Sequence, residues 1–149
     1  MGRDHVIFPF PQAGPAAILS LRSAGDLGWL LGQEAPARKA FLASLGLDAA
    51  QVLGTELHHT RRILFLRPGS QTLWGSPRPG EPPDGRDGFL VDPALGLGVT
   101  ITVADCMPIW ILDRASGAWG VLHSGWKGTG ILATAVEALA SAYGSRPAD

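Results

Sequence analysis

The sequence predicts a mixed α+β domain. Short apolar runs recur along the chain, at 63–66, 99–104 and 119–122; the run at 99–104 is rich in β-branched residues, and turn-forming residues separate the runs. Two other segments, 35–45 and 131–143, have the spacing of amphipathic helices. The 149 residues suffice for one hydrophobic core, so we expect residues 1–149 to form a single domain.

The first half of the chain predicts short elements in the following order. Residues 6–11 contain prolines and fit only an edge strand, and 17–22 form a second strand. In the helix at 35–45, Pro36 suits the first turn and Gly46 ends it. Asp48 caps a short helical turn that runs to Val52. The segment 56–66 then reads as a strand that carries His58 and His59 at its start.

The second half begins with a segment dominated by proline and glycine. Residues 67–88 predict a long loop, either a lid anchored by Trp74 or a plain flexible connection. A short element at 89–92 leads to three strands at 99–104, 109–112 and 119–122. The helix at 131–143 begins after Gly128-Thr129-Gly130, with Thr129 or Gly130 as its N-cap.

Composition narrows the class of protein. The chain is 46% apolar and 17% charged, as is typical of a globular protein. Its 12 basic and 13 acidic residues nearly balance and form no run of like charge, so we do not expect nucleic acid as a partner. A single cysteine excludes an internal disulfide and favours a reducing compartment. No stretch reaches the roughly 20 apolar residues that cross a bilayer. Prolines interrupt the N-terminal region where a signal peptide is apolar, so we expect a cytoplasmic protein without membrane contact.

The chemistry is expected between residues 100 and 130. Cys106 lies where one strand ends, next to Asp105, and His123 lies at the end of the last strand. Strand ends that open into glycine-containing loops usually expose catalytic side chains. The first amides of the following helix, together with Lys127, predict an anion pocket.

Two chemical interpretations use the same residues. In the first, Cys106, His123 and one of His58 or His59 bind zinc and leave a fourth position open. In the second, Cys106 is a nucleophile that His123 activates and that Asp105 or another polar group orients. Ordinary structural roles compete with both: a small core residue for the cysteine, packing for Trp126, and a solvated surface position for Lys127.

Two motifs resemble those of a known family. Ala-Asp-Cys-Met-Pro at 104–108 and His-Ser-Gly-Trp-Lys-Gly at 123–128 are similar to Ala-Asp-Cys-x-Pro and His-Ala-Gly-Trp-Arg-Gly of the laccase-domain family. That family is also described as multicopper polyphenol oxidoreductases and as purine nucleoside phosphorylases of the YfiH and YlmD type. Weaker similarities lie at 56–58, where the family has Gln-Val-His, and at 86–88, where it has Ala-Asp-Gly. The resemblance covers roughly residues 35–146.

The resemblance implies a fold, a metal and a reaction. The fold would have layered β-sheets flanked by helices. Zinc, rather than copper, would be bound by His58, Cys106 and His123. The reaction would be phosphorolysis of adenosine, inosine or methylthioadenosine, or deamination of adenosine, with Asp105 transferring protons alongside Cys106 and His123 as catalytic residues. Substrate and phosphate would be held by Trp126, Lys127 and Gly128.

The chain also departs from the family pattern. Lys127 replaces an arginine and keeps the charge without the bidentate fork, and Ser124 replaces an alanine. The family normally continues through a second half after the last helix. Three hypotheses therefore stand: a zinc-dependent nucleoside enzyme, a Cys-His hydrolase, and a non-catalytic fragment or subunit that needs a complementary chain or forms a homo-oligomer. The nucleoside, and the choice between phosphorolysis and deamination, stay open.

Overall fold

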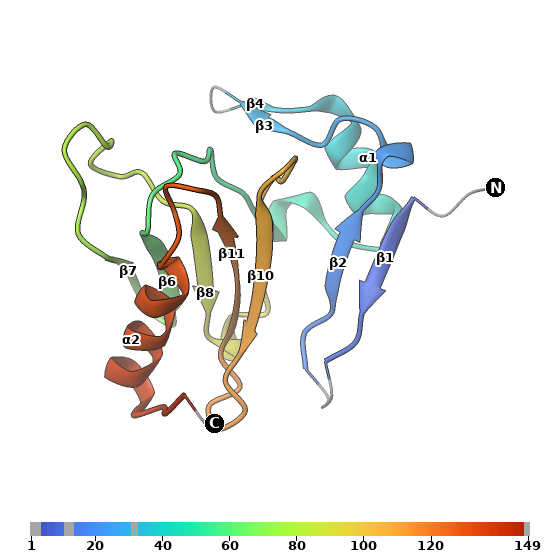
Figure 1. Ribbon diagram of the computed structural model, residues 1–149. Coiled ribbons are helices and arrows are strands. Elements are labelled where there is room, and N and C mark those ends of the chain that lie inside the picture. The colour runs from blue at the N-terminus through green and yellow to red at the C-terminus, as the bar shows by residue number, and fades with distance from the viewer. Residues whose placement is uncertain (1–3, 11–13, 31–32, 148–149) are drawn as a thin grey trace.

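A five-stranded sheet forms the centre of the computed structural model, which describes residues 4–10, 14–30 and 33–147 (Figure 1). The spatial order is β10-β11-β8-β6-β7. Only β6 and β8 run parallel; the other neighbouring pairs are antiparallel. These strands are β6 (Ile63–Arg67), β7 (Ser70–Trp74), β8 (Gly88–Val91), β10 (Met107–Leu112) and β11 (Trp119–Ser124). The predicted mixed α+β class is confirmed.

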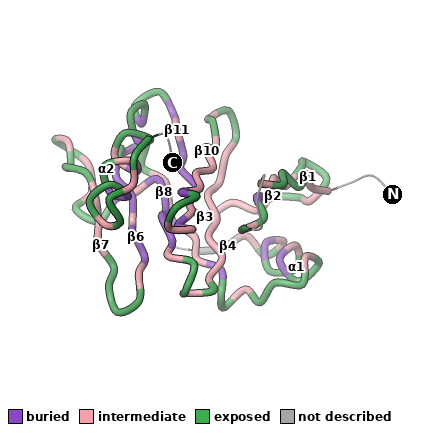
Figure 2. The backbone as a smooth tube through the Cα atoms, turned by 90° about the horizontal axis from the view of Figure 1, so that it is seen from below, coloured by how far each residue is buried: buried purple, intermediate pink, exposed green. Residues whose placement is uncertain are grey.

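Helix α2 (Ile131–Tyr143) covers one face of this sheet (Figure 1). It has the predicted bounds, with Gly130 as N-cap at φ 100° and Gly144 as a left-handed C-cap. Its buried residues recur at helical spacing and pack against the sheet in one cluster, whose members include Ile131, Ala135, Ala138 and Leu139 of α2 and Ile63, Phe65, Leu90 and Leu122 of the strands. Figure 2 shows that buried residues gather on β6, β8 and β11.

The opposite face is covered by the segment that leads to the predicted site. Leu66, Phe89 and Val91 form a second cluster there, with partly buried residues of 95–101 against it. The predicted strand at 99–104 is much shorter: β9 (Gly98–Val99) pairs in parallel with β5 (Val52–Leu53). Because β5 is only two residues long, the Thr100 amide makes the last bond to it, at the Leu53 carbonyl, and irregular chain follows to Cys106.

The N-terminal elements lie beside the β10 edge of the sheet (Figure 1). The predicted strands at 6–11 and 17–22 correspond to a shorter antiparallel pair, β1 (His5–Phe8) and β2 (Ala17–Ser20); residue 11 lies outside the described residues. Helix α1 (Pro36–Ser44) follows the prediction, and Asp48 accepts a hydrogen bond from the Ala50 amide as it caps a 3-10 turn at Ala49–Gln51. A 3-10 turn at Arg22–Ala24 and the pair β3 (Trp29–Leu30) and β4 (Gln33–Glu34) were not predicted, because such short elements carry no periodicity.

Two predictions around β6 are wrong. The strand begins at Ile63 and not at residue 56, so 54–62 is irregular. Strand β7 lies inside the proline-rich segment, because Gly69, at φ 71°, allows a tight hairpin turn after β6. The rest of this segment, 75–87, is tied to the body of the protein: Arg62 donates to the carbonyls of Pro82 and Pro83, and Arg78 to that of Lys127. In the part of the chain described, no helix is long and apolar enough to span a bilayer.

Candidate metal centre

The pairing of β10 with β11 brings two motifs to one end of the sheet. In this antiparallel register Pro108 lies opposite His123, and Met107 lies opposite Ser124. Cys106 directly precedes β10, and His123 is the second-last residue of β11. The start of one strand therefore meets the end of the other, which places both side chains at the same edge.

Three potential ligand residues converge there. One ligand atom each from His59, Cys106 and His123 lies within 4.8 Å of the others, and the Cys106 Sγ is 3.9 Å from the His59 Nε2. The two imidazole rings meet edge to face, with centroids 4.9 Å apart. Ligand atoms bound to one zinc at 2.0–2.3 Å lie roughly 3.3–3.8 Å apart, so this group fits the ion after small side-chain adjustments.

The group is supported from one side and open on the other. His123 is 3% exposed, Cys106 is half-buried and His59 is exposed. A ligand can therefore approach from the His59 side, while the sheet holds His123. An open position of this kind distinguishes catalytic metal sites from closed structural ones.

The buried carboxylate of Asp87 orients the His123 ring. The Asp87 side chain is fully buried and accepts the Nδ1 proton of His123 at 2.9 Å, which leaves the Nε2 lone pair available for a ligand. Burial alone would raise the pKa of Asp87, but hydrogen bonds from His123, Thr60 and His59 outweigh it and lower the pKa below its ordinary value of 3.8. The carboxylate therefore stays ionised and fixes the imidazole.

The same carboxylate also fixes the backbone conformation of residues 58–60. Asp87 accepts the amides of His58, His59 and Thr60 at 3.3, 2.8 and 2.7 Å, and the Thr60 hydroxyl at 2.8 Å. This wrapping holds His59 at φ 57°, a left-handed conformation that is uncommon outside glycine. It turns His59, not His58, towards Cys106 and His123. The resemblance implied His58, whereas the group in this structure contains His59, and the assignment of the metal ligand to one of these two histidines stays a prediction.

Glycines of the second motif allow this close packing. A Cβ added to Gly125 would lie 2.7 Å from the His59 ring and 3.0 Å from the Cys106 Sγ, and one added to Gly128 would lie 2.9 Å from the Thr60 carbonyl. The Gly128 amide donates to the Gly125 carbonyl at 3.0 Å. That amide therefore already has one acceptor, and its predicted contact with phosphate stays a prediction.

The remaining predicted residues, Asp105, Trp126 and Lys127, are exposed. Asp105 is exposed, and its Oδ1 lies 3.7 Å from the Cys106 Sγ. Burial and the carboxylates of Asp105 and Asp87 raise the pKa of the Cys106 thiol. Lys127 is exposed, and Trp126 is 93% exposed, which excludes the packing role considered for this tryptophan.

Sequence reasoning missed three residues beside the site. Asp87 appeared only as part of a turn, although an aspartate directly before an apolar strand was a usable signal. Arg61 lies over the start of α2, since a Cβ on Gly130 would be 3.5 Å from its guanidinium carbon. Arg78 donates to the Lys127 carbonyl and pairs with Glu81 at 3.1 Å.

Comparisons with known proteins agree with the motifs. Residues 34–149 match the family model described as multi-copper polyphenol oxidoreductase laccase. Purine nucleoside phosphorylase LACC1 of mouse is 44% identical over 66 residues, which are 42% of this chain and 15% of that protein. Purine nucleoside phosphorylase ORF3 of Streptomyces griseus is 29% identical over 128 residues, which are 82% of this chain and 48% of that protein.

Solved structures share the fold. The Bacillus licheniformis hypothetical protein YfiH superposes with a TM-score of 0.63 at 26% identity, over 83% of this chain and 48% of that one. YlmD from Geobacillus stearothermophilus gives a TM-score of 0.59 at 23% identity, over 77% of this chain and 44% of that one. The present chain thus spans about half the length of these structures. Because residues 34–149, most of this chain, match the family model, the chain belongs to the multi-copper polyphenol oxidoreductase laccase family.

Proposed function

We propose that this chain is a zinc-dependent enzyme of purine nucleosides that catalyses phosphorolysis or the deamination of adenosine. The observation that carries the proposal is the convergence of His59, Cys106 and His123 within 4.8 Å over the buried carboxylate of Asp87. The names of the mouse and Streptomyces relatives, both purine nucleoside phosphorylases, support the substrate class.

Zinc fits this donor set. Thiolate and imidazole are both zinc ligands, and an open position is typical of catalytic zinc sites; the same donors also occur in mononuclear copper sites, so the assay of metal content below includes copper. A laccase needs several copper sites, and across residues 4–10, 14–30 and 33–147 this is the one group of three or more such donors. When bound, zinc would supply Lewis-acid chemistry at the open side. Asp87 would keep the His123 ring in position throughout.

The open side offers groups for each part of the substrate. The exposed indole of Trp126 provides a flat surface on which a purine can stack. Lys127 is exposed and provides a positive charge for a phosphate, and the Arg78 guanidinium donates to its carbonyl while it pairs with Glu81. Asp105 is exposed beside Cys106 and is the candidate for moving a proton to or from the substrate.

The Cys-His hydrolase alternative receives less support. A nucleophilic cysteine needs a lowered pKa, whereas burial and the neighbouring carboxylates raise the pKa of Cys106. A bound cation reverses this balance, because it favours the thiolate as a ligand. The metal interpretation therefore uses the acidic surroundings of Cys106, and the nucleophile interpretation works against them.

The test combines metal content with product analysis. Purified wild type and Cys106→Ala are assayed for zinc and copper, then incubated with adenosine, with and without phosphate, and the products are separated by chromatography. We expect about one zinc in the wild type and little in Cys106→Ala, with product from the wild type only. Adenine formed only with phosphate identifies phosphorolysis, and inosine formed without it identifies deamination.

Two outcomes would contradict the proposal. Zinc without any product would show that the site binds metal but does not act on adenosine in this chain alone, which favours a subunit that needs a complementary chain. Turnover by metal-free protein that thiol alkylation abolishes would favour the hydrolase.

A further inference from the structure

A buried arginine holds the segment before Asp87 against the start of the central sheet. Arg62 directly precedes β6 and is 4% exposed. Its guanidinium donates to the Pro82 carbonyl at 2.9 Å and also to the Pro83 carbonyl. Both acceptors lie in the segment 75–87, which ends at Asp87. Because a planar guanidinium presents two donors in a fixed geometry, it defines the position of both carbonyls together.

The main chain of Arg62 contacts Asp87 as well. The Arg62 carbonyl accepts the Asp87 amide at 2.9 Å, and the Asp87 carbonyl accepts the His123 amide at 2.7 Å. The Arg62 amide donates to the Thr60 hydroxyl oxygen at 3.1 Å, and that hydroxyl donates to the Asp87 carboxylate at 2.8 Å. These contacts form a closed path from Arg62 through the segment 82–87 to Asp87 and back through Thr60. The path ends at His123 of the candidate metal centre.

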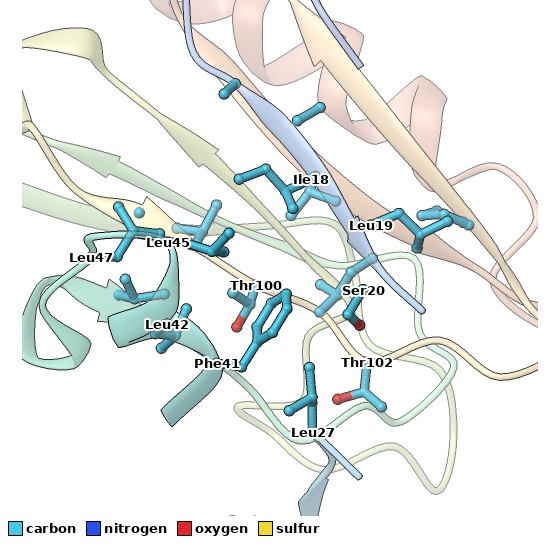
Figure 3. Close-up of a pocket in the computed structure, with 18 of the residues that line it drawn as sticks. Ile18, Leu19, Ser20, Leu27, Phe41, Leu42, Leu45, Leu47, Thr100 and Thr102 are labelled. Carbon is cyan, nitrogen blue, oxygen red and sulfur yellow. The ribbon is translucent and has the colours of Figure 1, made fainter. Parts of the chain in front are cut away.

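The N-terminal elements take no part in holding this carboxylate. A cavity of about 580 Å³ lies between β2, α1 and the segment 96–103, against β10 and β11 (Figure 3). Its lining includes neither Asp87 nor the residues whose hydrogen bonds the Asp87 side chain accepts, which are His58, His59, Thr60 and His123. The support of Asp87 therefore comes from the chain around Arg62 and from β11.

We infer that Arg62 is a positioning residue of the candidate metal centre. It fixes the segment 82–87 so that the Asp87 carboxylate lies 2.9 Å from the His123 Nδ1 and holds the ring in one orientation. Arg62 acts through Asp87 and not at the ligand atoms. The inference concerns the site of the proposed function, and it rests on that proposal only for the zinc readout.

The first test needs no metal. In metal-free protein with isotope-labelled histidine, the nitrogen chemical shifts of the His123 ring show whether Nδ1 carries the proton that Asp87 accepts. The signals are assigned by their loss in His123→Gln. The wild type should show the Nδ1-protonated ring, Arg62→Gln should show a mixture of both tautomers, and Arg62→Lys should lie between them, because lysine keeps the charge without the fork. A folded Arg62→Gln with the wild-type His123 signals would overturn the inference.

The second test measures zinc affinity against a competing chelator. Arg62→Gln should weaken zinc binding by about threefold to tenfold, which is less than Asp87→Asn, because Arg62 acts one contact further from the ligand atoms. In the Asp87→Asn background, the same substitution should change zinc affinity by less than about twofold, because the carboxylate through which Arg62 acts is absent. Equal fold losses in the two backgrounds would overturn the inference.

The matched control is Arg67→Gln. Arg67 ends the same strand, and its guanidinium lies over the Phe65 ring at 5.3 Å. Its loss should lower stability without a change in the His123 signals or in zinc affinity.

Circular dichroism shows which variants fold. If Arg62→Gln does not fold, Arg62→Lys decides in both tests: intermediate values support the inference, and wild-type values overturn it. A wild type that binds no zinc would contradict the proposed function, and the His123 signals would then decide the role of Arg62 by themselves.

Discussion

Replacement of Asp87 by asparagine tests whether the Asp87 carboxylate stabilises the fold and orients His123 in the candidate metal centre. The carboxylate accepts five hydrogen bonds: Oδ1 from the His59 amide and His123, and Oδ2 from the amides of His58 and Thr60 and from the Thr60 hydroxyl. Asparagine keeps one acceptor oxygen and presents an NH₂ group to the other donors. At least two of the five bonds are therefore lost, whichever way the amide is oriented.

The number of lost hydrogen bonds gives the expected loss of stability. Hydrogen bonds to charged groups contribute about 1.5–3 kcal/mol each, so the loss of two should lower the free energy of unfolding by about 3–6 kcal/mol. Zinc affinity should fall by about 10- to 100-fold, because the His123 ring loses its ionised acceptor. Urea unfolding measures the first effect, and zinc titration against a competing chelator measures the second.

The pH dependence of stability gives a further check. The pKa of Asp87 is lower in the folded protein than in the unfolded chain, so near pH 4 the unfolded chain binds more protons. The stabilisation is present above about pH 4 and is lost as the pH falls through the folded pKa. In Asp87→Asn this part of the acid dependence should disappear. The control is Asp84→Asn, an exposed aspartate in the same loop. Unchanged stability and zinc affinity in Asp87→Asn would refute the reasoning.

Two further predictions concern close packing and titration. Gly125→Ala should bind far less zinc, because its Cβ would lie 2.7 Å from the His59 ring, whereas Ser124→Ala should bind zinc normally; equal zinc content by atomic absorption would contradict this. The pKa of Tyr143 is raised to about 12 by burial and by its hydrogen bond to Asp92, so it stabilises the fold below pH 10 and loses this effect as the pH rises towards 12. The free energy of unfolding of Tyr143→Phe, measured with urea, should therefore fall less between pH 10 and 12 than that of the wild type. The same fall in both proteins would argue against the hydrogen bond between Tyr143 and Asp92.

Elements with a clear period were predictable from the sequence. Helix α2 was predicted with its observed bounds, because its apolar residues repeat at helical spacing between Gly130 and Gly144. The hairpin of β10 and β11 was visible as two apolar runs separated by a turn, and it places Cys106 beside the end of β11. Strand β7 was hidden because proline and glycine dominate the segment around it.

The details of the site depended on contacts between distant residues. His58 and His59 are neighbours of the same type, and only the wrapping of residues 58–60 around Asp87 distinguishes them. Asp87 lies 36 residues from His123, so no local pattern could connect them.

The most direct test of the central claim compares zinc content in His59→Ala and His58→Ala. Both side chains are exposed neighbours, so the two substitutions make the same chemical change one residue apart. If His59 completes the centre with Cys106 and His123, His59→Ala should lose zinc, and His58→Ala should keep about one ion per chain. Zinc retained in His59→Ala and lost in His58→Ala would contradict the geometry on which the proposed function rests.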